Sequence, residues 1–310
     1  MSKIEDILKK VCIKNNLGEL IFFERANEGM VSNSYILTTT MNKFFLKTYR
    51  GDFDINVHNI EKFMEGFGIP AINAIAVDMS EKSIIYPYVE SDRSHNYEMS
   101  DYYTMGKMLA NIHSASFGKV VLEKSGKFLY EEVKNNQSLV ETKKYIDFIE
   151  KKDIKDDTDL LFLIYLQKKL QYSGSFINNE ILPNDVLIHG DYHAGNLLFD
   201  KKTREIIGIC DWDKSKYAPR TYDVARAYLY IGFSSGTEDL ELCEEIGEKV
   251  LQGYRSVLPL SDEDLKKGIM INLKSYIYTS WLEENYYKLN NPRTNKFIKN
   301  KIKILDHFLK

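Results

Sequence analysis

The segment Ile188–Asp200 reads IHGDYHAGNLLFD. It places two histidines, an aspartate and an asparagine around a glycine-containing turn, and then runs directly into apolar residues. A solvated surface loop needs none of these residue types in this arrangement, whereas a metal or phosphate site needs side chains of this kind. The segment therefore predicts a functional loop that leads into a buried strand.

The apolar runs NLLFD and EIIGICD, joined by the polar residues KKTR, predict a β-hairpin after this loop. With the turn centred on Thr203 and Arg204, Asn196 faces Asp211, and directly opposed Cβ atoms are about 4.5–5.5 Å apart. Asp191 lies a few residues before Asn196. Two carboxylates and one amide oxygen suit Mg²⁺. The inference depends on the turn, because a slip of one residue would place Asn196 and Asp211 on opposite faces.

Asp191 and Asn196 are also common turn residues, so each alone is explained by the shape of the chain. Their joint spacing says more: His189 to Asn196 fits H-x-D-x-x-x-x-N, followed by an aspartate at the far end of a hairpin, as in protein kinases. HGD stands where protein kinases have HRD, and CDWD where they have DFG. With the following YDVARA, residues 188–227 resemble the aminoglycoside phosphotransferase and choline kinase superfamily, which includes homoserine, methylthioribose and spore-coat kinase-like proteins.

The resemblance implies a role for each acidic or amide residue of the segment. Asp191 is the catalytic carboxylate that accepts or orients the proton of a substrate hydroxyl. Asn196 and Asp211 hold Mg²⁺ against the phosphates of the nucleotide. A free aspartate has a pKa near 3.9 and is a weak base at neutral pH, so we expect Asp191 to act mainly by positioning the hydroxyl.

Other residues of the segment receive supporting roles. We expect His189 to brace the loop by packing and hydrogen bonds. His193 contacts phosphate or substrate, or else supports the loop from behind. Asp213 assists with the metal or the substrate. Asp223 fixes the loop and caps the helix that follows.

The segment KFFLKTY predicts a strand on which Phe45, Lys47 and Tyr49 share one face, because side chains alternate along a strand. A lysine between two aromatic residues is unusual on a solvated face. By the resemblance, Lys47 contacts the α- and β-phosphates of the nucleotide. The alternative is an edge-strand lysine whose stem lies along apolar surface.

A phosphate loop and a lysine partner are expected beside this strand. NEGMVSNSY contains Gly29 alone of the usual glycines, and Ser32 and Ser34 stand among the small polar residues that replace the others in the family. Backbone amides and these hydroxyls could bind phosphate oxygens. Glu61, in a predicted helix 14 residues after Lys47, is the candidate partner of the lysine, although an alignment back from GIP points nearer Val57.

The connector IIYPYV resembles the hinge of the family. There the backbone from Tyr86 through Tyr88 to Val89 would hydrogen-bond a purine, and the alternative for both tyrosines is plain packing. The following MGKMLANIHS resembles a helix of the family that has a structural role, and we expect His113 to be a core histidine.

These elements predict an α+β, two-lobed protein-kinase-like fold with a small β-rich N-terminal lobe and a larger, mainly helical C-terminal lobe. The expected domains are 1–89 for nucleotide binding, and 90–310 for catalysis and substrate binding. One long helix is predicted across 263–289. The basic C-terminal stretch 290–310 is predicted to be helical and to pack on the lobe surface.

The composition mainly excludes certain partners and certain classes of protein. The 310 residues carry a net charge of −3, which favours neither a nucleic-acid nor a membrane partner. The start lacks a signal peptide, there is no run of 18 apolar residues, and the three cysteines are too few and too widely spaced for a disulfide framework or a zinc site. We expect a cytoplasmic protein with free thiols that is a monomer or a weak dimer.

Acidic residues suggest the charge of the acceptor. One group lies between residues 238 and 248, and Glu284 lies in SWLEENYY beside Trp281 and two tyrosines. Carboxylates with aromatic rings suit a cationic molecule such as an aminoglycoside or an amino alcohol. The alternative is a solvated helix face.

The resulting hypothesis is a Mg²⁺-dependent kinase that transfers the γ-phosphate of ATP or GTP to a hydroxyl of a small, cationic molecule. The sparse glycine loop and the uncertain glutamate leave room for a catalytically silent nucleotide-binding or spore-coat relative. A metal-dependent hydrolase that uses the two histidines and Asp191 is a third possibility, and it would leave Lys47 without a role.

Overall fold

The computed structural model describes residues 3–26, 33–49, 54, 56–92, 94, 96–119, 135–176, 186–234 and 236–309. The chain divides into two compact units, one made of residues 1–96 and 195–215, the other of residues 97–194 and 216–310. The expected domain boundary after residue 89 remains a prediction. Each unit is described by itself.

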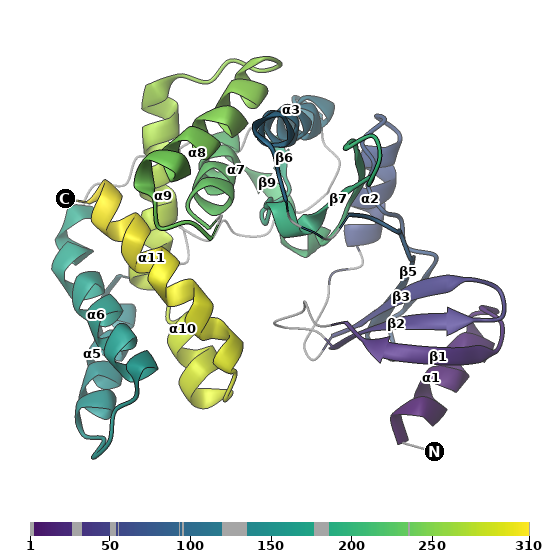
Figure 1. The fold of residues 1–310 in the computed structure, drawn as a ribbon, viewed down its shortest axis with the longest axis horizontal. Coiled ribbons are helices and arrows are strands. Elements are labelled where there is room, and N and C mark those ends of the chain that lie inside the picture. Colours follow the sequence, from purple (N-terminus) through teal and green to yellow (C-terminus); the bar gives the residue numbers. More distant parts are fainter. Residues whose placement is uncertain are drawn as a thin grey trace. The chain divides into compact units, whose positions relative to one another are not determined.

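The first unit contains a five-stranded antiparallel sheet in the order β1-β2-β3-β5-β4 and a separate hairpin, β7-β8 (Figure 1). Its elements are α1 (Lys3–Lys14), β1 (Leu20–Arg25), β2 (Asn33–Thr39), β3 (Lys43–Thr48), α2 (Asn56–Glu65), β4 (Ala76–Asp78), β5 (Ser83–Pro87), β7 (Leu197–Phe199) and β8 (Ile206–Ile209).

One face of this sheet is covered by α1. Leu8 and Cys12 of the helix are almost fully buried against Phe44 and Leu46 of β3. Because side chains alternate along a strand, the burial of these two residues turns Lys47 to the opposite face of the sheet. The predicted strand and the predicted placement of the lysine are confirmed.

The β7-β8 hairpin forms as predicted, but its predicted register is wrong by one residue. Leu197, rather than Leu198, faces Ile209. The turn is centred one residue earlier than expected, on Lys202 and Thr203, since the Asp200 N–H donates to the Glu205 carbonyl at 2.9 Å. A bulge in β8 then shifts the pairing by one residue. Polar residues between two apolar runs predict a hairpin, but they do not fix where the turn is closed.

The second unit is mainly helical and contains one short antiparallel pair, β6-β9 (Figure 1). Its elements are α3 (Met99–Ser116), α5 (Asn135–Glu150), α6 (Asp157–Tyr172), β6 (Val186–Ile188), β9 (Lys216–Ala218), α7 (Arg220–Ala227), a π-helical segment (Tyr228–Gly232), α8 (Leu240–Arg255), α9 (Asp262–Tyr278), α10 (Trp281–Glu283), a second π-helical segment (Glu284–Lys288) and α11 (Asn295–Phe308).

The helix predicted across 263–289 is interrupted. α9 ends at Tyr278, and Thr279 has extended backbone angles of −116° and 146°. The helical periodicity continues on both sides of the interruption, which is why the sequence suggests a single helix. The three cysteines are free, as predicted. No helix among the described residues is long and apolar enough to cross a membrane.

α3 and α8 approach each other through two glycines. A Cβ atom on Gly106 would lie 1.8 Å from the carbonyl oxygen of Val250, and one on Gly253 would lie 1.9 Å from the carbonyl oxygen of Tyr103. Both distances are far below van der Waals contact with rigid backbone. The two helices can pack at this distance only because both positions lack a side chain.

We therefore expect Gly106→Ala to destabilise the protein by about 3 kcal/mol or more, since the helices must move apart to admit the methyl group. Gly174→Ala is the matched control, because its Cβ would meet nothing within 4 Å. Thermal melting of both variants measures the effect. Equal melting temperatures for the two variants would show that the close approach is not needed.

Candidate functional site

A buried carboxylate holds the backbone of the predicted catalytic loop. Asp223, fully buried on α7, accepts hydrogen bonds from the N–H groups of His189 at 2.9 Å and Gly190 at 3.1 Å. Gly190 has a φ of 78°, in the left-handed region that favours glycine. The expectation that Asp223 caps its helix is wrong, because α7 begins at Arg220 with Pro219 in the cap position. Its predicted role in fixing the loop is confirmed.

Two further buried groups support the loop from within the second unit. The His189 ring is fully buried, accepts a hydrogen bond from the Asp191 N–H at 3.3 Å, and packs edge-on against Tyr192. His113 is also fully buried and bridges Asp223, at 3.3 Å, and Tyr254, at 2.9 Å. Both histidines are structural, as the sequence predicts.

The side chain of Asp191 is paired with an arginine that the sequence analysis did not identify. Arg226 Nη2 donates to Asp191 Oδ1 at 2.6 Å, and these side chains are only 11% and 14% exposed. The Arg226 guanidinium also lies 4.3 Å from the centre of the Tyr230 ring. One signal could have found this arginine: it stands three residues after Asp223, so both residues lie on the same face of one helix. His193, in the same loop, is half-buried.

In the first unit, the ammonium of Lys47 joins two carboxylates. Its Nζ lies 2.7 Å from Asp211 Oδ1 and 2.6 Å from Asp213 Oδ2, and the lysine side chain is 12% exposed. Tyr49 donates to the other oxygen of Asp213 at 3.0 Å. Burial opposes the charge of Lys47, but the two carboxylates outweigh it and hold the pKa of Lys47 above its ordinary value.

The backbone at Asp211 explains how two nearby carboxylates reach one lysine. β8 ends at Ile209, and Asp211 adopts a left-handed conformation with φ 66° and ψ 55°. That conformation is uncommon for residues other than glycine, although aspartate tolerates it better than most. Trp212 then enters the core completely and donates its indole N–H to the Ile209 carbonyl at 3.1 Å. The strand end and the buried tryptophan hold the turn between them.

Asn196 is buried beside this turn. Its carbonyl accepts a hydrogen bond from the Cys210 N–H at 3.0 Å, so the corrected register places Asn196 opposite Cys210 and not opposite Asp211. The predicted opposition therefore fails. The left-handed turn at Asp211 also ends the strand alternation there, so the two-face rule no longer applies to that residue.

The donor set in the first unit fits a divalent cation. The carboxylates of Asp211 and Asp213 already converge on one cation, the Lys47 ammonium, and hard oxygen donors of this kind suit Mg²⁺. Within the described part of the chain, no group of three or more His, Cys, Asp or Glu gathers in a metal-binding arrangement.

The predicted pairing of Lys47 with Glu61 is not present. Glu61 is buried on α2, where it accepts hydrogen bonds from the Tyr86 hydroxyl at 2.9 Å and the Ala74 N–H at 3.3 Å. Burial raises the pKa of Glu61 to about 7, and the hydrogen bonds from Tyr86 and Ala74 only partly oppose this rise. Lys47 instead pairs with Asp211 and Asp213, and Glu61 accepts a hydrogen bond from Tyr86.

The structure describes only some of the remaining candidates for the nucleotide site. Gly29 and Ser32 lie outside the described residues. Ser34 is buried on β2, opposite Lys47. In the connector, the Tyr88 N–H donates to the Lys43 carbonyl at 3.2 Å, which extends the ladder beyond β5, while Val89 is half-buried. The purine contacts assigned to this backbone remain predictions.

The acidic candidates for substrate binding are engaged in other contacts. Glu284 forms an exposed i,i+4 pair with Lys288 at 3.2 Å. Trp281 is 38% exposed and packs edge-on against Phe297. In the group between residues 238 and 248, Glu244 pairs with His307 at 2.8 Å. These contacts match the alternative of a solvated helix face.

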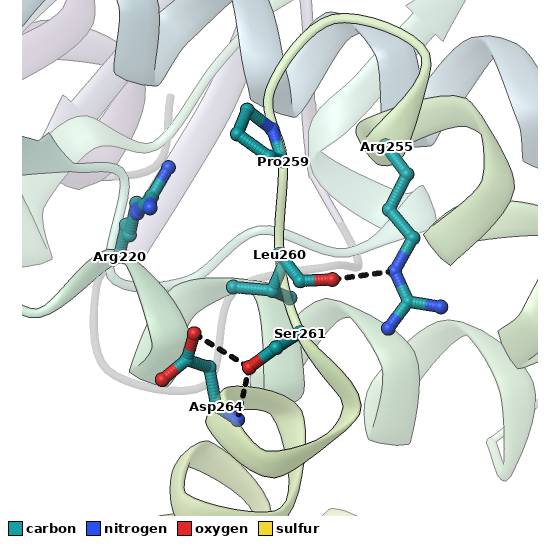
Figure 2. Close-up of a pocket in the computed structure, with 6 residues that line it drawn as sticks. All are labelled: Arg220, Arg255, Pro259, Leu260, Ser261 and Asp264. Carbon is teal, nitrogen blue, oxygen red and sulfur yellow. Dashed lines mark hydrogen bonds between the residues drawn. The ribbon is translucent and has the colours of Figure 1, made fainter.

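A separate cavity of about 550 Å³ lies in the second unit, and Figure 2 shows the residues that line it. It is lined by Arg220, Arg255, Pro259, Leu260, Ser261 and Asp264. Its polar groups are used locally, since Arg255 Nε donates to the Leu260 carbonyl at 2.8 Å and the Ser261 hydroxyl accepts from the Asp264 N–H at 3.1 Å. No residue of the predicted catalytic loop lines it.

The raised pKa of Glu61 predicts a pH-dependent stability. Between about pH 4.5 and 7 the unfolded chain ionises this carboxyl while the folded chain keeps it protonated, so stability falls as the pH rises through that window. Glu61→Gln should abolish this loss, which is on the order of 3 kcal/mol for a shift from 4.5 to about 7.

Thermal melting at pH 5 and pH 8 measures the effect. The advantage of Glu61→Gln over the unchanged protein should grow toward pH 8. Glu65→Gln, an exposed position on the same helix, is the control and should show no such growth. An advantage that is equal at both pH values would contradict the assignment.

Comparisons with known proteins agree with this geometry. The model of the phosphotransferase enzyme family matches residues 24–260. A spectinomycin phosphotransferase, solved with ADP and spectinomycin, is 18% identical with a TM-score of 0.70, and 98% of each chain is covered. An amicoumacin kinase solved with AMP-PNP and Ca²⁺ is 16% identical with a TM-score of 0.63, covering 98% of this chain and 95% of that one.

A choline kinase from Streptococcus pneumoniae is 17% identical with a TM-score of 0.57, covering 96% of this chain and 99% of that one. No match was found among the curated proteins. At these identities the solved structures show a shared fold, and the predicted kinase-like α+β fold is confirmed. The family match spans most of the sequence, with Lys47, Asp191 and Asp211 inside it, and the chain therefore belongs to the phosphotransferase enzyme family.

Proposed function

We propose that this protein is a Mg²⁺-dependent kinase that transfers the γ-phosphate of ATP or GTP to a hydroxyl of a small molecule. The observation that carries the proposal is the contact of Lys47 with Asp211, two residues 164 positions apart that the kinase pattern assigns to phosphate and metal. A structural lysine would not need a second carboxylate, and Asp213 supplies one.

Each unit supplies a different part of the chemistry. In the first, Asn196, Asp211 and Asp213 would hold Mg²⁺, and Lys47 would bind the phosphates. The metal would neutralise charge on the phosphate oxygens. In the second, Asp191 would orient the acceptor hydroxyl. Four residues of chain lie between Asp191 and Asn196.

The transfer itself is a single displacement. The acceptor oxygen forms a bond to the γ-phosphorus, and the bond from that phosphorus to the bridging oxygen breaks, leaving its electron pair on the nucleoside diphosphate. The hydroxyl proton passes to Asp191 and then to water. Arg226 keeps the Asp191 carboxylate in place, so catalysis depends more on position than on basicity.

The alternative is a catalytically silent nucleotide-binding or spore-coat relative. The observation that favours it is the missing Lys47–Glu61 pair, which active protein kinases require. Binding of Mg²⁺ and ATP without transfer to any acceptor would support this alternative. Transfer to one acceptor would exclude it.

The experiment is a panel of hydroxylated acceptors with ATP and GTP, read as release of ADP or GDP. The panel contains aminoglycosides, choline, ethanolamine, homoserine and methylthioribose. We expect Asp191→Asn to lower kcat at least about 100-fold and to leave the KM for nucleotide nearly unchanged, because only the acceptor loses its positioning group. Asp147→Asn, an exposed position on α5, is the control. Full turnover by Asp191→Asn would contradict the assignment of Asp191 as the catalytic carboxylate.

Arg226 tests the positioning argument separately. Arg226→Met should lower kcat about 10-fold or more and spare the nucleotide KM, because the Asp191 carboxylate loses its ion pair with Arg226. Arg226→Lys keeps the charge and should recover part of the loss. Thermal melting shows whether a variant is misfolded, and the kinetics then show whether Asp191 is mispositioned in a folded protein. If the lysine variant were no better than the methionine variant, the charge would not be what positions Asp191.

A further inference from the structure

A lysine that lacks an anionic partner lies in the second unit, on α11. The Nζ of Lys301 lies 4.3 Å from the centre of the Tyr276 ring and 5.9 Å from that of Tyr165. Among the residues that the structure describes, no carboxylate forms an ion pair with this ammonium and no oxygen accepts its protons. Burial lowers the pKa of Lys301, and the nearby Tyr230 and Glu283 only partly oppose this effect.

The carboxylates near Lys301 are paired with other cations. Lys169 pairs with Glu283 at 2.6 Å, and both side chains are fully buried. Arg226 pairs with Asp191. The two carboxylates are thus each paired with another cation, and Lys301 is a third cation that forms no ion pair with a described carboxylate. An unmatched charge of this kind costs stability, and sites that keep such a charge are candidates for function.

Ring contacts connect Lys301 to the predicted catalytic loop. The Tyr276 ring, over which the Lys301 ammonium lies, is 6.4 Å from the Tyr230 ring between ring centres. Tyr230 in turn lies under the guanidinium of Arg226, which holds Asp191. Tyr230 also stands in a π-helical segment, a rare conformation that is frequent at functional sites. All of these residues belong to one unit.

We propose that this cluster is the acceptor subsite and that Lys301 binds a carboxylate of the acceptor, whose hydroxyl is oriented by Asp191. The substrate class is therefore a hydroxy acid. This inference rests on the proposed function and makes it specific. A carboxylate supplies the missing counter-charge, whereas a cationic acceptor would add a fourth positive group to the cluster.

One observation favours a cationic acceptor, and it defines the outcome that would compete with this proposal. Oε2 of Glu283 is buried and accepts no hydrogen bond in the described part of the molecule. A cationic alcohol could donate to that oxygen. Lys169 already places a full positive charge on the other oxygen of this carboxylate, which weakens its attraction for a second cation.

The test uses D-glycerate, a hydroxy acid, and choline, a cationic alcohol, at matched ionic strength. Thermal melting is measured for the unchanged protein, Lys301→Met, Lys301→Arg and the exposed control Lys299→Met on the same helix. At ten times its Kd, glycerate should raise the melting temperature by roughly 2 °C in the unchanged protein, Lys301→Arg and Lys299→Met, and not in Lys301→Met. Without ligand, Lys301→Met should melt higher than the unchanged protein, since the unmatched charge is gone.

A melting temperature raised by choline and not by glycerate would overturn the subsite, as would no shift with either probe, or an equal glycerate shift in Lys301→Met. ADP release from ATP with each probe separates this inference from the proposed function. Transfer to choline alone would keep the kinase and remove the subsite. A Lys301-dependent glycerate shift without transfer to any acceptor would keep the subsite and remove the kinase.

Discussion

The buried carboxylate of Asp223 is the group on which the proposed catalytic loop depends. It accepts hydrogen bonds from the backbone N–H groups of His189 and Gly190, which water would otherwise accept. It also contacts the His113 ring. Hydrogen bonds to an ionised group contribute about 1.5–3 kcal/mol each. Because Asp223 stands on α7 and His113 on α3, the loop is fixed to two helices at once. The rigid backbone then leaves Arg226 to set the position of the Asp191 side chain.

The first unit uses the opposite arrangement, in which one cation is shared by two carboxylates. Lys47 with Asp211 and Asp213 carries a net negative charge, so the group still attracts a further cation. The left-handed turn at Asp211 brings both acids to the lysine, and the buried Trp212 holds that turn.

The sequence predicted the parts of this site that depend on local spacing. Lys47 lies on the face opposite the core because strand alternation is local, and the loop motif located Asp191 and its supporting histidine, His189. The hairpin register failed because the closing point of the turn and the bulge in β8 depend on backbone geometry that residue types do not encode. The Lys47–Glu61 pair failed because the partner of a buried acid is decided by tertiary packing, which gave Glu61 to Tyr86.

Charge at the proposed acceptor site illustrates the same limit more sharply. The conspicuous acids suggested a cationic substrate, yet Glu284 is neutralised by Lys288 one helical turn away, a pairing that the sequence already contains. Lys301, in a basic stretch that reads as surface, instead lies against tyrosines from α6 and α9. The number of charged residues near a site is therefore a weaker guide to its ligand than the number left unmatched after folding. Lys301 is such a residue, since no described carboxylate forms an ion pair with it.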